Sequence, residues 1–328
     1  MIRIFLVLFA SLIFSSCTAT ANNAVTAQVR YTIIPEAPRP GDPITIGINS
    51  YAKEVLLFVN EKQAAKALCF SIPAEYSGEL ERSRAPRRNS RLSERQPGFM
   101  AAIITIPTTI EAEVATIIIN NEAGLLCEIP ITITPREFHS ETLRLTPALS
   151  SLATDPNPQR TAESRRLWEI LSTTGNQVYH TGPFVLPVTS TRRTSQFASR
   201  RINQYPNGRT TTSIHAGVDF GIPTGTPVVA CGAGKVVLAR MRIISGYSVI
   251  IEHAPGVYSI YYHLDSVSVQ EDTIVEAGEL IGLSGSTGFS TGPHLHWELR
   301  VSTENTDPDA FISRPIIDKE LIISRIYN

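Results

Sequence analysis

The segment from Val228 to Val301 is a succession of short runs, rich in β-branched and aromatic residues and separated by glycine or proline. Runs of this kind favour β-strands. A series of them implies antiparallel sheets with a groove and not a βαβ fold. The runs that precede the last strand are Val228–Ala230, Lys235–Ala239, Tyr247–Glu252, Tyr258–Tyr262 and Leu280–Ser284.

Two histidines that flank one leucine lie in the last of these strands. Residues Pro293–Val301 alternate in a strand-like way, and one face collects the apolar side chains Leu295, Trp297, Leu299 and Val301. Because residues i and i+2 of a strand project from the same face, His294 and His296 point together from the other face. Such a pair alone is more often half-exposed than metal-binding, so the motif needs partners.

Two further motifs supply those partners. His215 and Asp219 are four residues apart, and His263 follows two tyrosines. Gly217 and the β-branched Val218 argue against a helix, so a turn that runs into a strand would bring His215 and Asp219 to one point. The three motifs hold four of the seven histidines of the chain. A catalytic zinc holds three protein ligands and keeps a position for water, so the constellation indicates a hydrolytic metal centre. Spacing alone does not say which histidine of the H-x-H pair binds the metal.

The segment His215–Arg300, about a quarter of the 328 residues, resembles the lysostaphin-type, or LytM-domain, zinc metalloendopeptidases. Enzymes of that family cut peptide cross-links in peptidoglycan. The matching motifs are His215-Ala-Gly-Val-Asp219-Phe-Gly-Ile-Pro-Thr-Gly-Thr-Pro-Val, Gly232-Ala-Gly-Lys-Val, Tyr261-Tyr262-His263-Leu264, Gly282-Leu-Ser-Gly285-Ser-Thr-Gly288 and Thr291-Gly-Pro-His294-Leu-His296-Trp-Glu.

The resemblance implies that His215, Asp219 and His296 hold Zn²⁺. It also implies that His263 and His294 are catalytic: they orient or deprotonate the water and stabilise the tetrahedral oxyanion. The function expected is a zinc-dependent endopeptidase that hydrolyses peptide stems or cross-links of peptidoglycan by a metal-activated water. The alternative is a catalytically inactive LytM-like adaptor that binds and activates another cell-wall hydrolase. Such members lose metal ligands, whereas this chain retains every ligand and both catalytic histidines.

Several other residues of this segment receive roles. Tyr261 and Tyr262 alternate around the sheet, so one is expected to face the groove and hydrogen-bond the reacting carbonyl while the other packs. His253 is assigned a structural role. Glu298 is interpreted as a solvated or paired edge carboxylate, with support of one histidine as the alternative. Three glycines before the H-x-H strand are interpreted as a groove wall, with a flexible hairpin as the alternative: Gly285, Gly288 and Gly292.

Residues 1–21 have the features of a secretory signal peptide. Arg3 precedes an apolar run, Ile4–Phe14, that is too short to span a bilayer, and small residues follow. Ser15-Ser16-Cys17 resembles a lipoprotein processing site, and lipidation of Cys17 would anchor the protein to a membrane. The alternative is ordinary cleavage after Ala19-Thr20-Ala21. Either outcome predicts an exported protein of the periplasm or cell envelope.

Residues 25–136 are a series of short apolar runs with turn signals between them, which predicts an immunoglobulin-like β-sandwich. This region contains no convergent set of acids, histidines or serines, so we assign it a spacer, docking or regulatory role. The fold class expected is therefore mainly β, with this sandwich followed by an antiparallel LytM-like peptidase domain with a central groove. The seven candidate strands are 31–34, 44–48, 55–59, 68–72, 101–106, 115–119 and 129–133.

The remaining domain boundaries follow from the positions of glycine and proline in the sequence. Residues 137–190 are a connector with a short helix at Thr161–Thr174, ended by Gly175. The LytM-like domain spans 191–313, and 314–328 are a C-terminal helix or tail. The stretch Arg192–Asn207, or the sandwich, could cover the zinc, which is a hypothesis of autoinhibition.

Composition adds few constraints. The net charge of −1 gives no overall attraction to nucleic acid or to an anionic membrane. Six arginines between residues 82 and 95 indicate either contact with an anionic envelope polymer or lipid headgroups, or a mobile hairpin tip. Cys69 and Cys127 lie in apolar runs and form either a disulfide or two buried thiols. Cys231 is expected to be a small buried residue. Nothing in the composition indicates an oligomeric state.

Overall fold

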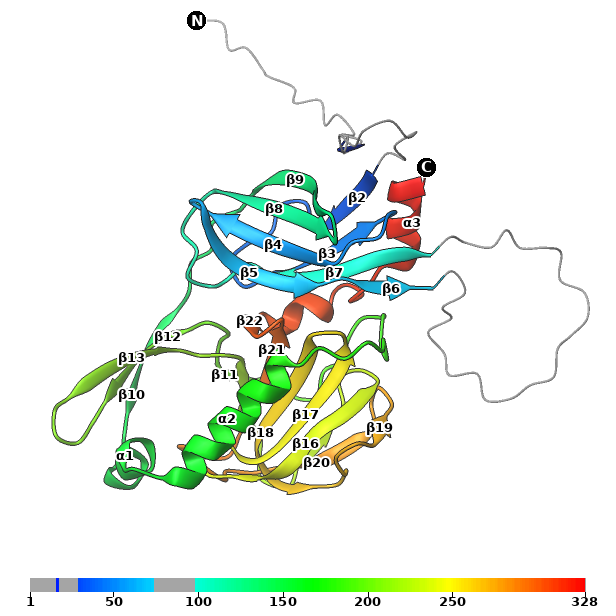
Figure 1. The fold of residues 1–328 in the computed structure, drawn as a ribbon. Coiled ribbons are helices and arrows are strands. Elements are labelled where there is room, and N and C mark those ends of the chain that lie inside the picture. The colour runs from blue at the N-terminus through cyan, green and yellow to red at the C-terminus, as the bar shows by residue number, and fades with distance from the viewer. Residues whose placement is uncertain (1–15, 18–28, 74–97, 328) are drawn as a thin grey trace, which may run out of the picture.

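The computed structural model describes residues 16–17, 29–73 and 98–327 (Figure 1). The predicted signal peptide, residues 1–21, lies outside the described residues apart from the two-residue strand β1 (Ser16–Cys17). The arginine cluster between residues 82 and 95 also lies outside them. Among the helices that are described, none combines the length and the apolar character needed to pass through a bilayer.

The N-terminal region consists of two antiparallel sheets that face each other, with strand orders β1-β2-β3-β7-β6 and β5-β4-β8-β9. Alternate side chains of the strands point inward, and those of both sheets meet in one core. The two facing sheets do not by themselves establish the predicted immunoglobulin-like topology, which stays a prediction. The bounds are β2 Val29–Ile34, β3 Pro43–Ile48, β4 Glu54–Val59, β5 Lys62–Leu68, β6 Phe70–Ile72, β7 Phe99–Thr105, β8 Val114–Asn121 and β9 Gly124–Thr132.

One predicted strand of this region, residues 68–72, is divided between two strands: Leu68 ends β5, and Phe70–Ile72 form β6. The chain changes sheets at Cys69, because β5 pairs with β4 whereas β6 pairs with β7 in the other sheet. The earlier residues of β5 are mostly polar or small, so no apolar alternation marks them as a strand. Cys69 and Cys127, which are both among the described residues, are not joined by a disulfide.

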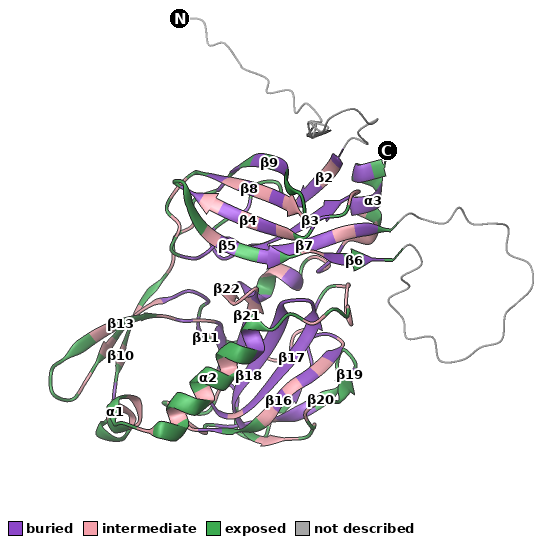
Figure 2. Ribbon diagram, in the orientation of Figure 1, coloured by how far each residue is buried: buried purple, intermediate pink, exposed green. Residues whose placement is uncertain are grey.

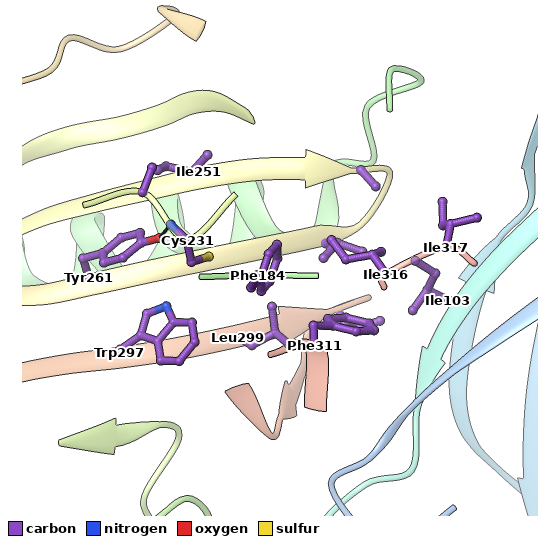
Figure 3. Packing of buried hydrophobic residues seen from close by; sticks show 14 of the residues in the cluster. Ile103, Phe184, Cys231, Ile251, Tyr261, Trp297, Leu299, Phe311, Ile316 and Ile317 are labelled. Atoms are coloured by element: carbon purple, nitrogen blue, oxygen red, sulfur yellow. Dashed lines mark hydrogen bonds between the residues drawn. The ribbon is translucent and has the colours of Figure 1, made fainter. Parts of the chain in front are cut away.

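The outer face of the first sheet packs against the C-terminal end of the chain (Figures 1 and 3). Ile103 of β7 shares a core cluster with Ile316 and Ile317. The hydroxyl of Thr45 donates to the carbonyl oxygen of Ile316 at 2.8 Å. Residues 314–328, predicted as a helix or tail, include the helix α3 (Lys319–Tyr327), which lies against β2 and β3. The last residues of the chain therefore hold the N-terminal sheets against the C-terminal domain.

The connector contains more regular structure than the sequence predicts. β10 (Ser140–Arg144) forms a small sheet with β12 (Arg200–Gln204) and β13 (Thr210–Ile214), and it runs parallel to β12. Two helices follow, α1 (Pro147–Thr154) and α2 (Pro158–Ser172). In each helix an Asn or Thr side chain caps the N-terminus and proline takes the first position, where its missing N–H costs nothing. The sequence predicts only the second helix, whose second half carries Leu167, Trp168, Ile170 and Leu171, and misses the short α1.

The C-terminal domain is built on a ten-stranded sheet, which confirms the mainly β, antiparallel class. Its main path is β11-β14-β21-β18-β17-β16-β19, and β15, β20 and β22 pair beside this path. The 3-10 helix η1 (Pro308–Phe311) follows the last strand. The bounds are β11 Arg193–Ser195, β14 Val218–Phe220, β15 Pro227–Val229, β16 Gly234–Arg242, β17 Gly246–Ala254, β18 Val257–Val267, β19 Ile274–Val275, β20 Leu280–Ser284, β21 Leu295–Val301 and β22 Glu304–Thr306.

The two faces of this sheet have different covers. One face carries the main core, to which Tyr261 and Trp297 contribute (Figure 3). The opposite face carries Tyr258 and Tyr262, which pack in one cluster with Ile170 of α2. Because both faces are covered, β17 and β18 are buried along most of their length (Figure 2). Helix α2 therefore lies on the face of the sheet from which the polar side chains of β21 project.

Candidate metal centre

Strand pairing positions the three predicted ligands. Asp219 on β14 lies directly opposite His296 on β21, and residues paired in this way share a face of the sheet. His215 lies just before β14. A Cβ atom at Gly217 would lie 2.1 Å from the carbonyl oxygen of Trp297, so only glycine allows the turn to approach β21 this closely. The turn that the sequence predicts brings His215 next to Asp219.

Three side-chain atoms converge on this face. His215 Nε2 lies 3.1 Å from Asp219 Oδ1 and 3.0 Å from His296 Nδ1. His296 Nδ1 lies 2.7 Å from Asp219 Oδ1. All three residues are buried. The structure thus brings the three predicted ligands together as a candidate metal site.

The outer hydrogen bonds of the two histidines leave lone pairs that face one another. His215 Nδ1 lies 2.8 Å from the carbonyl oxygen of Gln196, and His296 Nε2 lies 2.9 Å from Glu298 Oε1. Each acceptor calls for an N–H, so the neutral form of each ring keeps its unprotonated nitrogen toward Asp219. Two imidazole lone pairs and a carboxylate oxygen repel one another unless a cation lies among them. The donor set therefore fits a metal held by two histidines and one carboxylate.

The pKa values of these groups reflect the same arrangement. Burial alone would lower the pKa of His296, but hydrogen bonds with Asp219 and Glu298 raise it to about 9. Burial lowers the pKa of His215 in spite of its bond with Asp219. Burial would raise the pKa of Asp219, but both histidines hold it well below its usual range. In the absence of a metal the site takes up a proton, so a metal and a proton compete for it.

Glu298 supports His296. Of the interpretation as a solvated or paired edge carboxylate, the pairing is confirmed, whereas Glu298 is buried and lies on a strand inside the sheet. Its Oε1 accepts from His296 Nε2, and its Oε2 accepts from Arg300 Nε at 2.8 Å. The same strand alternation that directs His294 and His296 to one face also directs Glu298 there, so the alternative of a supporting carboxylate was visible in the pattern.

The two predicted catalytic histidines lie beside the three converging residues. The ring centroids of His263 and His294 are 4.7 Å apart, and those of His263 and His296 are 6.1 Å apart. His294 Nε2 lies 3.8 Å from Asp219 Oδ1. The structure therefore gathers all five predicted site residues in one place.

Backbone carbonyls of the loop between β20 and β21 hold both of these rings. His263 Nδ1 lies 2.8 Å from the carbonyl oxygen of Thr287, and His294 Nδ1 lies 2.8 Å from that of Gly292. The neutral form of each ring therefore carries its proton on Nδ1 and a lone pair on Nε2. Gly288 has a φ of 76°, and a Cβ atom there would lie 2.4 Å from the backbone at the start of β17. The loop is therefore closely packed at Gly288, whereas a Cβ atom at Gly292 would meet no other atom within 4 Å.

Tyr262, and not Tyr261, lies at the site, so the expectation that one tyrosine packs is confirmed. The Tyr262 ring stacks on His296 with a centroid separation of 5.6 Å, and its hydroxyl accepts from Arg242 Nη1 at 3.3 Å. Tyr261 is buried on the other face, where its hydroxyl accepts from the N–H of Cys231 at 2.8 Å. Cys231 is itself buried, as expected.

Three side chains near the site escape the sequence-based reasoning. Ser195 Oγ lies 2.9 Å from His215 Nδ1, and Arg201 Nη2 donates to Asp219 Oδ2 at 3.0 Å. Glu141 of β10 accepts from both of them. Ser195 and Arg201 belong to the stretch 192–207, which the hypothesis of autoinhibition names beside the sandwich as a cover for the metal, and this stretch contacts two of the converging residues. Autoinhibition by it stays a prediction.

A mainly β domain that gathers two histidines and an aspartate around one point, with two more histidines beside them, defines a candidate metal-dependent hydrolase. Residues 213–308 match peptidase family M23, and this segment is a domain of that family. The lysostaphin-type resemblance is thereby confirmed.

Relatives match this domain and not the whole chain. Over 110 residues the chain is 41% identical to the peptidoglycan DD-endopeptidase ShyA of Vibrio cholerae. The matched segment covers 34% of this chain and 25% of that protein. Over 93 residues it is 45% identical to lysostaphin of Staphylococcus staphylolyticus. This second matched segment covers 27% of this chain and 19% of that protein. The match thus spans a quarter or less of each relative.

A solved structure extends the likeness of fold beyond the matched domain. The crystal structure of a putative peptidase M23 from Pseudomonas aeruginosa aligns with a TM-score of 0.52 over 84% of this chain and 94% of that chain. The sequence identity is 20%, so the likeness concerns the fold alone.

Proposed function

We propose that this protein is a zinc metallopeptidase, an endopeptidase that hydrolyses peptide stems or cross-links of peptidoglycan. The observation that carries the proposal is the convergence of His215 Nε2, Asp219 Oδ1 and His296 Nδ1 beside two further histidines. Structural zinc sites use four protein ligands, whereas catalytic sites use three and leave one position open. Within the described residues the converging group has three members, which favours a catalytic site.

His215, Asp219 and His296 would hold the zinc ion. When bound, zinc lowers the pKa of a water molecule and polarises a substrate carbonyl. His263 and His294 each present an Nε2 lone pair, so one of them can accept a proton from the attacking water. The other can donate a hydrogen bond, once protonated, to the carbonyl oxygen on which negative charge develops.

The surroundings keep these rings ready for that chemistry. Burial, together with the nearby His294 and His296, lowers the pKa of His263 to about 3. His263 is therefore neutral near pH 7, and its Nε2 lone pair can accept a hydrogen bond from the attacking water. The carbonyl oxygens of Thr287 and Gly292 fix the tautomers, and the ring of Tyr262 fixes the orientation of His296. Less reorganisation is then needed when the reaction occurs.

The substrate class is inferred from the relatives. One of them bears the name of a peptidoglycan DD-endopeptidase, and an exported enzyme of the periplasm or cell envelope would meet the same polymer. Membrane anchoring through a lipidated Cys17 is part of this proposal, although the side chain of Cys17 lies outside the described residues. The inactive adaptor is not supported, because all five site residues are present and gathered in one place.

The test uses the purified full-length chain. We expect one Zn²⁺ ion per chain, and we expect the protein to release peptide-containing fragments from purified sacculi. Mass spectrometry of products from defined muropeptides would identify the bond that is cleaved. A chain that holds no stoichiometric zinc and leaves sacculi intact would overturn the proposal.

A further inference from the structure

Glu141 lies outside the segment that matches family M23, yet it is connected to the candidate metal site through two other side chains. It belongs to β10, where it pairs with Arg201 of the parallel strand β12. Its carboxylate accepts from Ser195 Oγ at 2.8 Å and from Arg201 Nε. Each of these two donors also contacts a residue of the converging group.

The two contacts form two branches. Through Ser195, whose Oγ lies 2.9 Å from His215 Nδ1, Glu141 is linked to the first histidine. Through Arg201, whose Nη2 donates to Asp219 Oδ2 at 3.0 Å, it is linked to the carboxylate. Arg201 Nη2 also donates to Ser195 Oγ at 3.0 Å, which joins the branches. Because Arg201 occupies Oδ2, the other oxygen of Asp219, Oδ1, faces the two histidines.

Glu141 also balances charge at this position. Arg201 places a positive charge against Asp219, and that charge by itself would weaken the attraction of the site for a cation. The carboxylate of Glu141 offsets it on the other side of the guanidinium. The Arg201 and Asp219 side chains are 21% and 11% exposed, so solvent screens their interaction only in part. Arg201 can therefore orient Asp219 without leaving an uncompensated charge beside the metal.

We infer that Glu141 is a positioning residue of the metal site, which holds Ser195 and Arg201 so that His215 and Asp219 are oriented for the ion. The inference rests on the proposed function, because that proposal supplies the metal. Partners of this outer kind orient ligands and commonly govern metal affinity. The functional unit would then begin in β10, well before the predicted domain start at residue 191.

The test compares the Zn²⁺ affinity of three full-length chains: the wild type, Glu141→Gln and Glu271→Gln. Glu271 is a matched control, because its carboxylate pairs with Arg240 at 2.6 Å in the same domain but none of its hydrogen bonds or ion pairs involves the site. Competition with a chromophoric chelator gives the affinities. We expect Glu141→Gln to bind Zn²⁺ about 10- to 100-fold more weakly than the wild type, and Glu271→Gln to bind as the wild type does.

Two more measurements separate positioning from a general loss of structure. The visible absorption of bound Co²⁺ reports ligand geometry, and we expect Glu141→Gln to change it while the thermal unfolding of the metal-free chain stays that of the control. Ser195→Ala and Arg201→Met each cut one branch, so each should give part of the loss of affinity.

Several outcomes would overturn the inference. One is an unchanged Zn²⁺ affinity in Glu141→Gln, and another is an equal loss in Glu271→Gln. A Glu141→Gln chain that does not fold without metal would also contradict it, because Glu141 would then be a requirement of the fold. A wild-type chain that binds no Zn²⁺ would instead refute the proposed function, so the two failures are distinguishable.

Discussion

The C-terminal domain buries two histidine clusters, and they differ in whether each ring nitrogen has a complementary hydrogen-bond partner. In the first, His253 on β17 has no exposed surface. Its Nδ1 lies 2.8 Å from the carbonyl oxygen of Ala233, and its Nε2 lies 2.7 Å from the hydroxyl of Ser259. In the neutral ring Nδ1 donates to that carbonyl. Nε2 also lies 3.7 Å from the Cys231 thiol, whose proton it can accept, so the neutral ring is satisfied. In the second cluster, around His296, three acceptor atoms face one another instead.

The pKa values of the two histidines move in opposite directions for this reason. Burial lowers the pKa of His253 to about 3, because no carboxylate compensates a charge on the ring. The pKa of His296 rises to about 9 in spite of burial, because Asp219 and Glu298 stabilise a cation there. Burial of a histidine therefore does not by itself indicate a metal site. A metal site is indicated where several lone pairs converge and, in the neutral rings, no protein donor lies among them.

The largest effect that would test this contrast is the loss of one histidine from each cluster. His296→Ala removes one of three donors, so we expect no stoichiometric zinc and no measurable peptide hydrolysis. His253→Gln keeps a donor and an acceptor in the other cluster and should retain zinc. Metal analysis and a sacculus-hydrolysis assay on both chains check the prediction. Stoichiometric zinc in His296→Ala would show that the convergence does not form the metal site.

A second substitution separates the roles within the H-x-H pair. His294→Ala leaves the three converging atoms in place, so zinc should remain. Turnover should fall about 10²- to 10⁴-fold, the usual contribution of one acid–base group. Hydrolysis rates measured at a zinc content equal to that of the wild type check this. Full activity in His294→Ala would show that the assignment of His294 to the chemistry is wrong.

The sequence predicts this site well because its contacts are local or follow from strand alternation. The period of two places His294 and His296 on one face wherever the strand lies. The turn before Asp219 follows from Gly217, and the partner strand only has to pair in register. These short-range rules bring four of the five residues together. His263 has a φ of 61°, so strand alternation does not place it, and both its inclusion and the roles of all five residues follow from the resemblance to the lysostaphin-type family.

The outer contacts could not be predicted in the same way. Glu141 meets Arg201 only because β10 pairs with β12 across 60 residues, and no pattern in either strand marks that pairing. The crossing of the chain between sheets at Cys69 is similar, because one apolar run continues through it. Helix α1 spans only eight residues, none of them buried, and its two leucines are too few to mark a helix in the sequence.

The lowered pKa of His253 predicts that the free energy of unfolding depends on pH, an effect smaller than the two above. The folded pKa of His253 lies below the unfolded value of about 6.5, so between pH 6.5 and 3 the unfolded state binds more protons. Stability from this group is therefore present above pH 6.5 and is lost as the pH falls. Between pH 7 and 5 the loss is about 2 kcal/mol. The free energy of unfolding of His253→Gln should fall less over this range than that of the wild type.

Urea denaturation of both chains at pH 7 and pH 5 measures this difference, with a chelator present so that zinc does not contribute. The comparison between chains removes the other titrating groups, which both share. Parallel pH dependence in the wild type and His253→Gln would contradict the view that His253 is held neutral by burial.

The smallest effect concerns Tyr262. Its ring contacts the metal centre, and its hydroxyl does not. The ring stacks on His296, whereas the hydroxyl accepts a long bond of 3.3 Å from Arg242, which also donates to Ser245 at 3.0 Å. Tyr262→Phe keeps the stack and removes the hydroxyl. We expect unchanged zinc affinity and turnover, and a loss of about 1 kcal/mol in stability. A fall in turnover of tenfold or more at full zinc occupancy would show that the hydroxyl turns to the reacting carbonyl during catalysis.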